Sequence, residues 1–384
     1  MQYRKFEALG IECSLFGIGS MRLPLLKNAD GSTDSEKIDE PEAVRIIRYG
    51  IDHGVNYIDT AYGYHGGNSE RLLGKALADG YRKRIRLATK LPVWLVKTYE
   101  DFDRLLEEQL TRLNTDYIDF YLLHALHRES WEKVRDMGIL DWLDRKVSSG
   151  QIRYPGFSFH DQLPVFKEII DSYDWKMCQI QLNILDETLQ AGVEGLRYAG
   201  SKGIPAVIME PLRGGKLAAA SPDILDLWNQ AEEKRSPVEW AFRWLYNFPE
   251  VSVILSGIST MEQLKDNLRI FEHAQPGCMS SRELDLVKRV KAQYDSKVKV
   301  GCTACEYCLP CPNGVSIPVI FGIWNDSSIF GMREEYQNRY RKLITEEKGA
   351  SSCVACGICE AACPQHIQVI EKLKQADAAL RCDP

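Results

Sequence analysis

Residues 86–113 read RLATKLPVWLVKTYEDFDRLLEEQLTRL, a short apolar segment followed by an amphipathic one. A β-strand is predicted over Arg86–Leu91 and an α-helix over Asp101–Leu113, where apolar residues recur at helical spacing. The same strand-then-helix order recurs from Leu15 to residue 274, which gives eight units in all. Eight such units in this length favour a parallel (β/α)8 barrel, the TIM-barrel fold, over an open sheet.

The other strands and helices are predicted from the same pattern. The remaining strands are expected at Leu15–Ser20, Tyr57–Asp59, Ile118–His124, Arg153–Phe159, Met177–Asn183, Ala206–Pro211 and Ser252–Gly257. Further helices are expected at Glu42–His53, Ser69–Asp79 and Trp131–Ser148, and one more begins at Pro237 after the capping residue Ser236. The first residues, Gln2–Leu9, could form an extra hairpin strand that seals the bottom of the barrel.

The alternation of strands and helices stops near residue 290. Lys288–Lys299 is predicted to be a charged helical tail, and the aromatic-rich stretch Ile317–Glu347 is also predicted to be helical. We therefore divide the chain into a barrel over residues 1–290 and a mainly α-helical domain over residues 291–384. No low-complexity linker separates the two parts, so we expect them to be docked.

The composition of the chain narrows its function class. Of its 384 residues, 45% are hydrophobic and 27% are charged, as in a soluble globular enzyme. The net charge of −6 predicts no basic surface for nucleic acid, and apolar runs such as Val251–Leu255 are too short to span a bilayer. The opening MQYRKFEALG has no apolar signal-peptide core. We expect a cytoplasmic protein without nucleic-acid or membrane partners.

Four polar residues fall at or just beyond the C-terminal ends of predicted barrel strands: Asp59, Tyr64, Lys90 and His124. In barrels of this kind the loops after the strands converge at that face, and the chemistry takes place there. A tyrosine is a poor proton donor near neutral pH, and a nearby ammonium held by a carboxylate would lower its pKa. Tyr64 could then protonate a developing alkoxide while His124 orients the carbonyl oxygen.

Each of these residues also has an ordinary structural interpretation. Alone, any of them fits a solvated loop or a strand end, and a single histidine at a strand end is more often structural than catalytic. Four suitable residue types at four suitable places favour the catalytic interpretation. Trp94 and the loop of residues 125–127 are candidates for the walls of a substrate pocket, although Trp94 could equally pack against the barrel rim.

Several stretches resemble the aldo-keto reductase family. The segments NYIDTAYGYHGGNSE, LATK and YLLH, which carry the four polar residues, resemble the segments of that family's catalytic tetrad. The resemblance runs from residue 2 to residue 275 and implies hydride transfer between a nicotinamide cofactor and a carbonyl or alcohol. It also implies cofactor-binding residues in later strands and loops: Ser158, Gln179, Met209, Leu212, Gly214, Ser259, Gln263 and Asn267. Gly19, at the end of the first strand, could let the backbone approach the cofactor, although an ordinary turn explains it equally well.

Three departures from the family pattern affect the cofactor site. Phe159 stands where the family usually has asparagine, so the nicotinamide carboxamide is expected to lose one partner. Met209 replaces an aromatic residue that usually stacks on the nicotinamide, and its thioether would cover that face less rigidly. Gly257 and Thr260 occupy places where NADP-dependent members commonly carry basic residues. Because a 2′-phosphate needs charge-assisted partners, we expect NAD(H) rather than NADP(H).

Two basic residues could reverse this preference for NAD(H). Arg269 or Lys265, in the helix predicted after the last barrel strand, could supply the missing positive charge. In that case the chain would accept NADP(H).

Eight of the twelve cysteines form two short runs, each followed by proline. The first run, C-x2-C-x2-C-x2-C, contains Cys302, Cys305, Cys308 and Cys311, and the second, C-x2-C-x2-C-x3-C, contains Cys353, Cys356, Cys359 and Cys363. This spacing is typical of proteins with two [4Fe-4S] clusters. Two zinc sites are the alternative, since sets of four cysteines also suit zinc.

Resemblance to two-cluster ferredoxins implies a crossed set of ligands, because the fourth cysteine of a run commonly binds the other cluster. Cluster one would take the first three cysteines of the first run with Cys363, and cluster two the first three of the second run with Cys311. The first run is one residue shorter before Cys311, and the long spacer between Cys311 and Cys353 resembles that of α-helical ferredoxin domains, so a ferredoxin-like domain is expected over residues 291–384. The other cysteines, Cys13, Cys178, Cys278 and Cys382, are interpreted as ordinary packed or surface residues.

These features predict an oxidoreductase with a nicotinamide cofactor and two clusters. Nicotinamides pass electron pairs and a cluster passes one electron, so direct exchange would need a converter such as a flavin, and the sequence has no strong flavin motif. One hypothesis is a working carbonyl reductase whose clusters exchange electrons with a ferredoxin or flavoprotein partner. The alternative is an electron-transfer or redox-sensing protein whose barrel binds a nucleotide without carbonyl turnover. A third possibility is that the clusters are purely structural.

Overall fold

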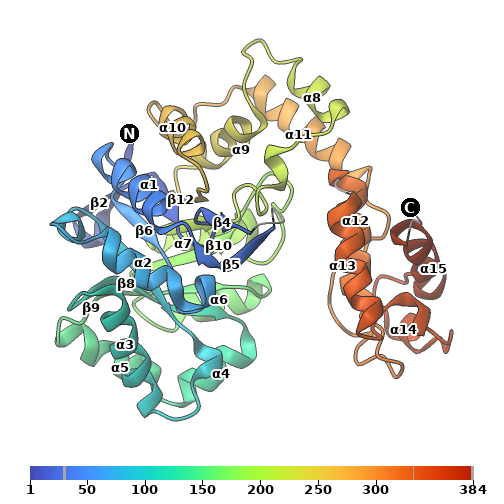
Figure 1. Ribbon diagram of the computed structural model, residues 1–384, viewed down its shortest axis with the longest axis horizontal. Coiled ribbons are helices and arrows are strands. Elements are labelled where there is room, and N and C mark those ends of the chain that lie inside the picture. Colours follow the sequence, from blue (N-terminus) through green and yellow to red (C-terminus); the bar gives the residue numbers. More distant parts are fainter. Residues whose placement is uncertain (29–31, 332, 382–384) are drawn as a thin grey trace. The chain divides into compact units, whose positions relative to one another are not determined.

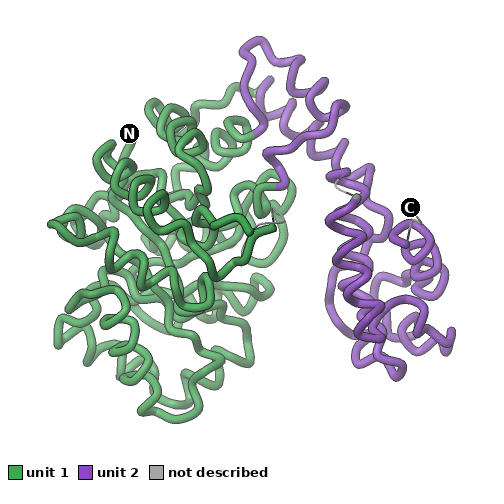
Figure 2. Tube along the Cα trace, viewed as in Figure 1, with its two compact units in different colours: residues 1–215, 238–281 green, residues 216–237, 282–384 purple. Residues whose placement is uncertain are grey.

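A computed structural model describes residues 1–28, 32–331 and 333–381. The chain divides into two compact units, which are coloured separately in Figure 2. The first unit contains residues 1–215 and 238–281, and the second contains residues 216–237 and 282–384. The domain boundary expected at residue 290 stays a prediction, since compactness groups residues 216–237 with the C-terminal part of the chain.

The first unit is built around a closed barrel of eight parallel strands (Figure 1), which confirms the predicted fold. In barrel order the strands are β3 (Phe16–Gly19), β6 (Tyr57–Asp59), β7 (Arg86–Leu91), β8 (Ile118–Leu126), β9 (Ile152–Phe159), β10 (Met177–Gln181), β11 (Ala206–Met209) and β12 (Val251–Gly257). All eight coincide with predicted strands to within a few residues. Their short runs of buried apolar residues are typical of strands that are covered on both faces.

Helices follow the strands and cover the outside of the barrel (Figure 1). They are α1 (Glu40–Asp52), α2 (Asn68–Ala76), α3 (Glu100–Leu113), α4 (Arg128–Asp136), α5 (Ile139–Ser148), α6 (Leu163–Asp171), α7 (Gly192–Ser201), α9 (Pro237–Tyr246) and α10 (Met261–Ile270). The single helix predicted over Trp131–Ser148 is wrong. Gly138 divides it into α4 and α5, because its φ of 84° lies in the left-handed region that glycine tolerates and a right-handed helix does not.

Two hairpins accompany the barrel. β1 (Tyr3–Phe6) pairs antiparallel with β2 (Ile11–Ser14), and the ring of Phe6 lies 5.7 Å from that of Phe120 inside the barrel. This hairpin confirms the strand expected at Gln2–Leu9. A second hairpin, β4 (Leu25–Lys27) with β5 (Thr33–Ile38), was not predicted, because its strands are largely exposed and lack an apolar face.

The second unit is mainly α-helical, as predicted. Its helices are α8 (Pro222–Trp228), α11 (Ser281–Asp295, whose first residue belongs to the first unit), α12 (Ile317–Phe330), α13 (Arg333–Thr345), α14 (Ile358–Ala362) and α15 (Val369–Leu380). The stretch Ile317–Glu347 is helical as predicted, and Gly331, with a φ of 70°, ends α12 within it. The tail predicted at Lys288–Lys299 belongs to α11, which begins and ends earlier than expected.

The core of the C-terminal helices is aromatic and aliphatic. It joins α12, α13 and α15, and its buried members include Phe321, Trp324, Tyr336, Tyr340 and Leu373. Several cysteines of the two runs pack against this core.

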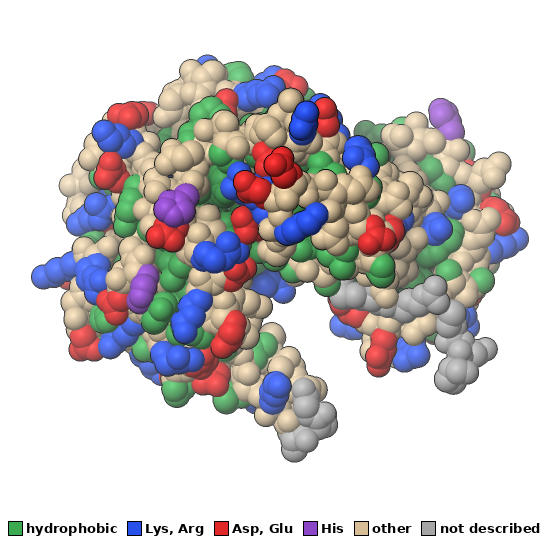
Figure 3. Space-filling model, turned by 90° about the horizontal axis from the view of Figure 1, so that it is seen from above, with side chains coloured by type: hydrophobic (Ala, Val, Ile, Leu, Met, Phe, Trp, Pro, Cys, Tyr) green, Lys and Arg blue, Asp and Glu red, His purple; other side chains and the backbone are tan. Residues whose placement is uncertain are grey.

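No described helix is long and apolar enough to cross a membrane. Acidic and basic side chains are interspersed over the face drawn in Figure 3.

Candidate active site and cluster-binding region

The barrel brings the four predicted catalytic residues together at the C-terminal ends of neighbouring strands. Asp59 ends β6, Lys90 lies in β7 and His124 lies in β8, while Tyr64 begins a short 3₁₀ turn after β6. The ammonium nitrogen of Lys90 lies 2.8 Å from both carboxylate oxygens of Asp59 and 3.5 Å from the hydroxyl of Tyr64. The Tyr64 and His124 rings meet edge to face with centroids 6.2 Å apart. All four side chains thus form one cluster.

Burial determines the proton affinities of this cluster. Burial raises the pKa of Tyr64 above its ordinary value, and the positive charge of Lys90 opposes that rise without cancelling it. Burial acts to lower the pKa of Lys90, but its interactions with the Asp59 carboxylate and with Tyr64 prevail and raise it. Burial, together with the charge of Lys90, holds the pKa of His124 well below its ordinary value. At neutral pH the cluster therefore contains a phenol, an ammonium and a neutral imidazole.

A buried polar network lies behind Lys90. The carboxylate of Glu70, in α2, accepts hydrogen bonds from Thr89 at 2.7 Å, Gln109 at 2.7 Å and Arg112 at 3.2 Å. The amide nitrogen of Gln109 also donates to the backbone oxygen of Lys90 at 3.0 Å. Because Glu70 and Gln109 are fully buried, no water competes for these bonds, and the network fixes the backbone from which Lys90 projects.

Aromatic and imidazole groups stand at the mouth of the barrel beside His124. The ring of Trp94 lies 5.0 Å from that of His124, although the Trp94 side chain remains 53% exposed. His160 directly follows β9, and its Nδ1 lies 3.3 Å from the amide nitrogen of Gln190. Trp94 thus reaches the candidate site as expected and offers an accessible aromatic face.

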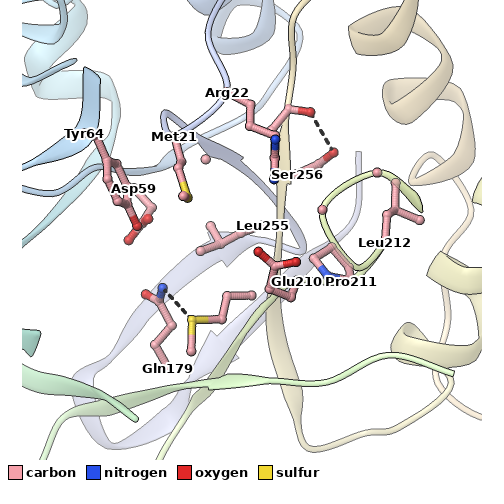
Figure 4. Close-up of a pocket in the computed structure, with 15 residues that line it drawn as sticks. Met21, Arg22, Asp59, Tyr64, Gln179, Glu210, Pro211, Leu212, Leu255 and Ser256 are labelled. Carbon is pink, nitrogen blue, oxygen red and sulfur yellow. Dashed lines mark hydrogen bonds between the residues drawn. The ribbon is translucent and has the colours of Figure 1, made fainter. Parts of the chain in front are cut away.

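A cleft opens beside the catalytic cluster (Figure 4). It is lined by Gly19, Met21, Arg22, Asp59, Tyr64, Gln179, Met209, Glu210, Pro211, Leu212, Gly214, Gly215, Leu255, Ser256 and Gly257. These residues come from the ends of β3, β6, β10, β11 and β12 and from the loop after β11. The cleft therefore begins at the polar cluster and continues to a glycine-containing loop.

Five of the predicted cofactor-binding residues line this cleft: Gly19, Gln179, Met209, Leu212 and Gly214. Ser158 is paired with Gln179 across β9 and β10, and its hydroxyl accepts a hydrogen bond from the backbone nitrogen of Ala125 at 2.7 Å. Ser158 thus lies directly beside the cleft.

Of the other three predicted residues, Ser259 lies in the turn from β12 into α10 and Gln263 and Asn267 lie in α10, and none is part of the cleft lining. The amide oxygen of Gln263 accepts a hydrogen bond from the backbone nitrogen of Ser259 at 2.9 Å. Asn267 is buried and donates to the hydroxyl of Ser256, which does line the cleft, at 3.1 Å. This turn therefore connects to the cleft through Ser256.

The cleft contains an unsatisfied buried acceptor. The amide oxygen of Gln179 has no hydrogen-bond partner among the described residues, while its amide nitrogen points to the sulfur of Met209 at 3.7 Å (Figure 4). A buried acceptor without a partner costs free energy unless a ligand supplies a donor. A carboxamide group, which offers two N–H donors, fits this position.

The cleft is also lined by a cation, Arg22, that was not predicted from the sequence. A Cβ built on Gly214 would lie 3.0 Å from a guanidinium nitrogen of Arg22, so this side chain faces the glycine loop across the cleft. Among the described residues, none forms an ion pair with Arg22. The residue stands three positions after the end of β3 in no motif that the sequence analysis used, and only its place after a barrel strand could have suggested a role.

In the second unit, the described cysteines of the two runs fall into two groups that share Cys308. Burial is the main cause of the raised pKa of Cys308, and the charges of Cys302, Cys305 and Cys363 raise it further, so these four thiols are neighbours. A separate hollow is lined by Cys311, Cys353, Cys356 and Cys359, together with Cys308. Within the described ranges, no three His, Cys, Asp or Glu side chains converge on a single metal ion.

The described cysteines outside the two runs, Cys13, Cys178 and Cys278, are buried or partly buried. Cys13 and Cys178 are buried in the barrel, where burial raises the pKa of each to about 12 and so suppresses the reactive thiolate. Cys278 is partly buried, and Cys382 lies outside the described residues. Among the cluster cysteines, Cys305 and Cys356 are exposed.

Comparisons with known proteins agree with this architecture. A model of the aldo/keto reductase family matches residues 16–277, and a model of the 4Fe-4S dicluster domain matches residues 301–368. The chain is 30% identical over 279 residues to the 6-dehydroglucose reductase of Novosphingobium aromaticivorans, covering 66% of this chain and 85% of that protein. It is 24% identical over 323 residues to the oxidoreductase YrpG of Bacillus subtilis, covering 71% of this chain and 91% of that protein.

Solved structures show the same fold. The holo form of the aldo-keto reductase AKR11C1 from Bacillus halodurans has 25% identity and a TM-score of 0.62, and the match covers 76% of this chain and 96% of that one. An aldo/keto reductase from Klebsiella pneumoniae, solved in complex with NADP and acetate, has 22% identity and a TM-score of 0.58, with coverage of 73% and 93%. The chain belongs to the aldo/keto reductase family and carries a C-terminal 4Fe-4S dicluster domain.

Proposed function

We propose that the barrel catalyses hydride transfer between a nicotinamide cofactor and a carbonyl or alcohol substrate. The observation that carries this proposal is the Tyr64 hydroxyl, 3.5 Å from the buried Lys90 ammonium and beside a cleft with an unsatisfied amide oxygen. A bound nicotinamide would supply or accept the hydride. The chain's own residues supply the proton, the orientation of the carbonyl and the exclusion of water.

Tyr64 holds the proton that neutralises the developing alkoxide. Its raised pKa keeps the phenol protonated through neutral pH, and the Lys90 ammonium stabilises the phenolate that remains after proton transfer. Asp59 holds Lys90 in place through two hydrogen bonds of 2.8 Å. The neutral ring of His124, near the Tyr64 ring, can donate an N–H to the carbonyl oxygen without adding a charge.

The cleft supports binding of a dinucleotide. Gln179 and Ser158 would hold the carboxamide of the nicotinamide, and Met209 would cover one face of its ring. The loop through Leu212 and Gly214, with Arg22 opposite, offers backbone and cationic partners for phosphates. Ser259, Gln263 and Asn267 are assigned to the adenosine end.

We propose that NAD(H) is preferred to NADP(H). No basic side chain stands at Gly257 or Thr260, and the Thr260 hydroxyl is used as the N-cap of α10. Arg269, which could have supplied the charge, is held by Glu239 and Asp266 at 2.9 Å each. These ion pairs leave it less able to bind a 2′-phosphate.

We propose that the second unit holds two [4Fe-4S] clusters with crossed ligands. Cys302, Cys305, Cys308 and Cys363 would bind the first, and Cys311, Cys353, Cys356 and Cys359 the second, which agrees with their two neighbourhoods. Because Cys305 and Cys356 are exposed, each cluster would have a solvent-facing ligand. This exposure favours one-electron exchange with a ferredoxin or flavoprotein over a purely structural role.

The same exposure keeps a second function open, namely electron transfer or redox sensing without carbonyl turnover. Tyr64→Phe separates the two. The substitution removes the proton donor and keeps the ring, so carbonyl-dependent oxidation of NADH should fall by at least ~100-fold while NADH binding persists. Unchanged turnover would rule out the proposed proton donor. If the wild-type protein with its clusters reduces none of a panel of aldehydes and ketones, the second function is favoured.

A further inference from the structure

The imidazole of His65 connects two backbone segments beside the cleft. Its Nε2 lies 3.3 Å from the backbone nitrogen of Leu23, and its Nδ1 lies 2.6 Å from the backbone oxygen of Ser35. Leu23 directly follows Met21 and Arg22 of the cleft lining, and Ser35 lies in β5. One side chain thus ties the turn that begins at Tyr64 to both segments.

These two partners determine which ring nitrogen of His65 donates and which accepts a hydrogen bond. A backbone N–H group can only donate a hydrogen bond, so Nε2 of His65 must accept and carry no proton. A carbonyl oxygen can only accept, so Nδ1 must carry the proton. The neutral Nδ1–H tautomer is the one form of the ring that makes both hydrogen bonds in this orientation.

The turn that carries His65 has an unfavourable backbone conformation. The φ angles of His65, Gly66 and Gly67 are 53°, 62° and 92°, and the left-handed region is disfavoured for a residue with a Cβ. The β4–β5 hairpin also holds this turn through a 3.0 Å hydrogen bond from Asn68 to the backbone oxygen of Glu36. The conformation of the turn therefore depends on contacts with the hairpin.

The hydroxyl of Tyr64 is weakly fixed by its own contacts. Among the described residues it has one hydrogen bond, the 3.5 Å contact with Lys90, which is at the long limit for such a bond. Its neighbour His65 has two backbone partners. Because the ring contacts with Lys90 and His124 do not include the hydroxyl, the position of the Tyr64 hydroxyl depends strongly on the backbone of the turn.

We propose that His65 is a positioning residue that places the Tyr64 hydroxyl for proton transfer by tying the turn to Leu23 and Ser35. This inference rests on the proposed function, since it assigns His65 to proton donation by Tyr64. His65 acts through the backbone of the turn, since both of its ring hydrogen bonds are to backbone atoms. Its loss should affect the rate of the chemical step more than the binding of either substrate.

His65→Gly is the first test, because glycine accepts the left-handed conformation and removes the imidazole with its two hydrogen bonds. It should lower kcat for carbonyl reduction by about 10- to 100-fold, the range for a misplaced catalytic group, with little change in KM or in the Kd for NADH. His65→Asn keeps one donor and one acceptor and tolerates this φ, so it should recover part of the loss. His53→Gly, which removes an exposed ring bonded to the backbone oxygen of Tyr49, is the matched control.

Hydrogen exchange of the cluster-loaded protein, without NADH or substrate, tests the hydrogen bond between Leu23 and His65 without relying on activity. The Leu23 amide should exchange at least ~10-fold faster in His65→Gly than in the wild type, and its rate should be unchanged in His53→Gly. Wild-type kcat in His65→Gly, or unchanged exchange at Leu23, would overturn the proposal. A parallel loss of kcat, NADH affinity and melting temperature would also overturn it, because it would indicate a general structural role. If the wild type reduces no carbonyl while Leu23 exchange responds as predicted, the proposed function fails, but the structural link between His65 and Leu23 is supported.

Discussion

Gln109 connects the backbone of Lys90 to a buried carboxylate. Its amide nitrogen lies 3.0 Å from the backbone oxygen of Lys90 and 2.7 Å from the carboxylate of Glu70. Its amide oxygen accepts a hydrogen bond from Tyr121 at 2.7 Å. All four side chains are fully buried, so each polar atom depends on its protein partner. The network is therefore expected to support both the stability of the barrel and the position of the lysine.

Gln109→Leu should destabilise the barrel unit. The substitution leaves the Lys90 carbonyl and the Tyr121 hydroxyl without this partner, and each unsatisfied buried group costs about 1–3 kcal/mol. Thermal unfolding followed by tryptophan fluorescence should show a clear decrease in the melting temperature. Glu107→Gln, on the exposed side of the same helix, should change stability by less than about 0.5 kcal/mol. Equal melting temperatures for the two variants would contradict the role of the network.

The pH dependence should follow the phenol of Tyr64. Burial raises its pKa, so the proton donor stays loaded through neutral pH, and carbonyl reduction should decline only above about pH 10, the ordinary pKa of tyrosine. The charge of Lys90 lowers this pKa, so Lys90→Met should move the decline to still higher pH while reducing the rate. Steady-state rates of carbonyl reduction, measured as a function of pH for the wild type and Lys90→Met, test the direction of this shift. A shift of the Lys90→Met profile to lower pH would contradict it.

The crossed cluster ligands can be tested by pairs of substitutions. Cys363→Ala should remove one cluster and lower the iron content from about eight to about four atoms per chain. Adding Cys305→Ala should lower it no further, because both cysteines are assigned to the same cluster. Adding Cys356→Ala instead should remove the second cluster. Anaerobic iron analysis and EPR of the two double variants distinguish crossed from uncrossed binding, since uncrossed ligands would reverse the two results.

Cofactor preference should respond to a charge introduced beside α10. Thr260→Arg places a guanidinium where a 2′-phosphate is expected and should improve the NADPH to NADH ratio of kcat/KM by about tenfold, equivalent to 1.4 kcal/mol. The same change removes the N-cap of α10, at a cost of about 0.5–2 kcal/mol of stability. Thr260→Ser keeps the cap and serves as the control. A ratio that does not change would indicate that the adenosine end lies elsewhere.

The barrel could be predicted from sequence because each strand is a short apolar run that ends in polar residues. Asp59, Lys90 and His124 follow such runs, so their meeting at one face depends only on the order of strands around the barrel. Tyr64 lies five residues after Asp59 in an irregular turn, and the family resemblance supported its assignment. The two helix breaks at Gly138 and Gly331 were missed because helical periodicity continues on both sides of each glycine.

Other features depend on tertiary contacts that no local pattern encodes. Glu70 and Gln109 lie on helices, where polar residues usually face solvent, and only the assembled barrel buries them. The expectation that Lys90 lowers the pKa of Tyr64 is correct for that charge alone, but burial outweighs it. The β4–β5 hairpin and its bond to His65 were missed because exposed polar strands lack an apolar alternation.

Transfer of deuterium from the C4 position of labelled NADH tests the central claim most directly. Purified protein loaded with clusters is incubated without oxygen with the labelled cofactor and a panel of aldehydes and ketones, and the alcohol products are analysed by mass spectrometry. The account predicts one deuterium on the former carbonyl carbon in the wild type and about 100-fold less product in Tyr64→Phe. Oxidation of NADH with reduction of the clusters, and with no deuterium in any alcohol, would contradict it.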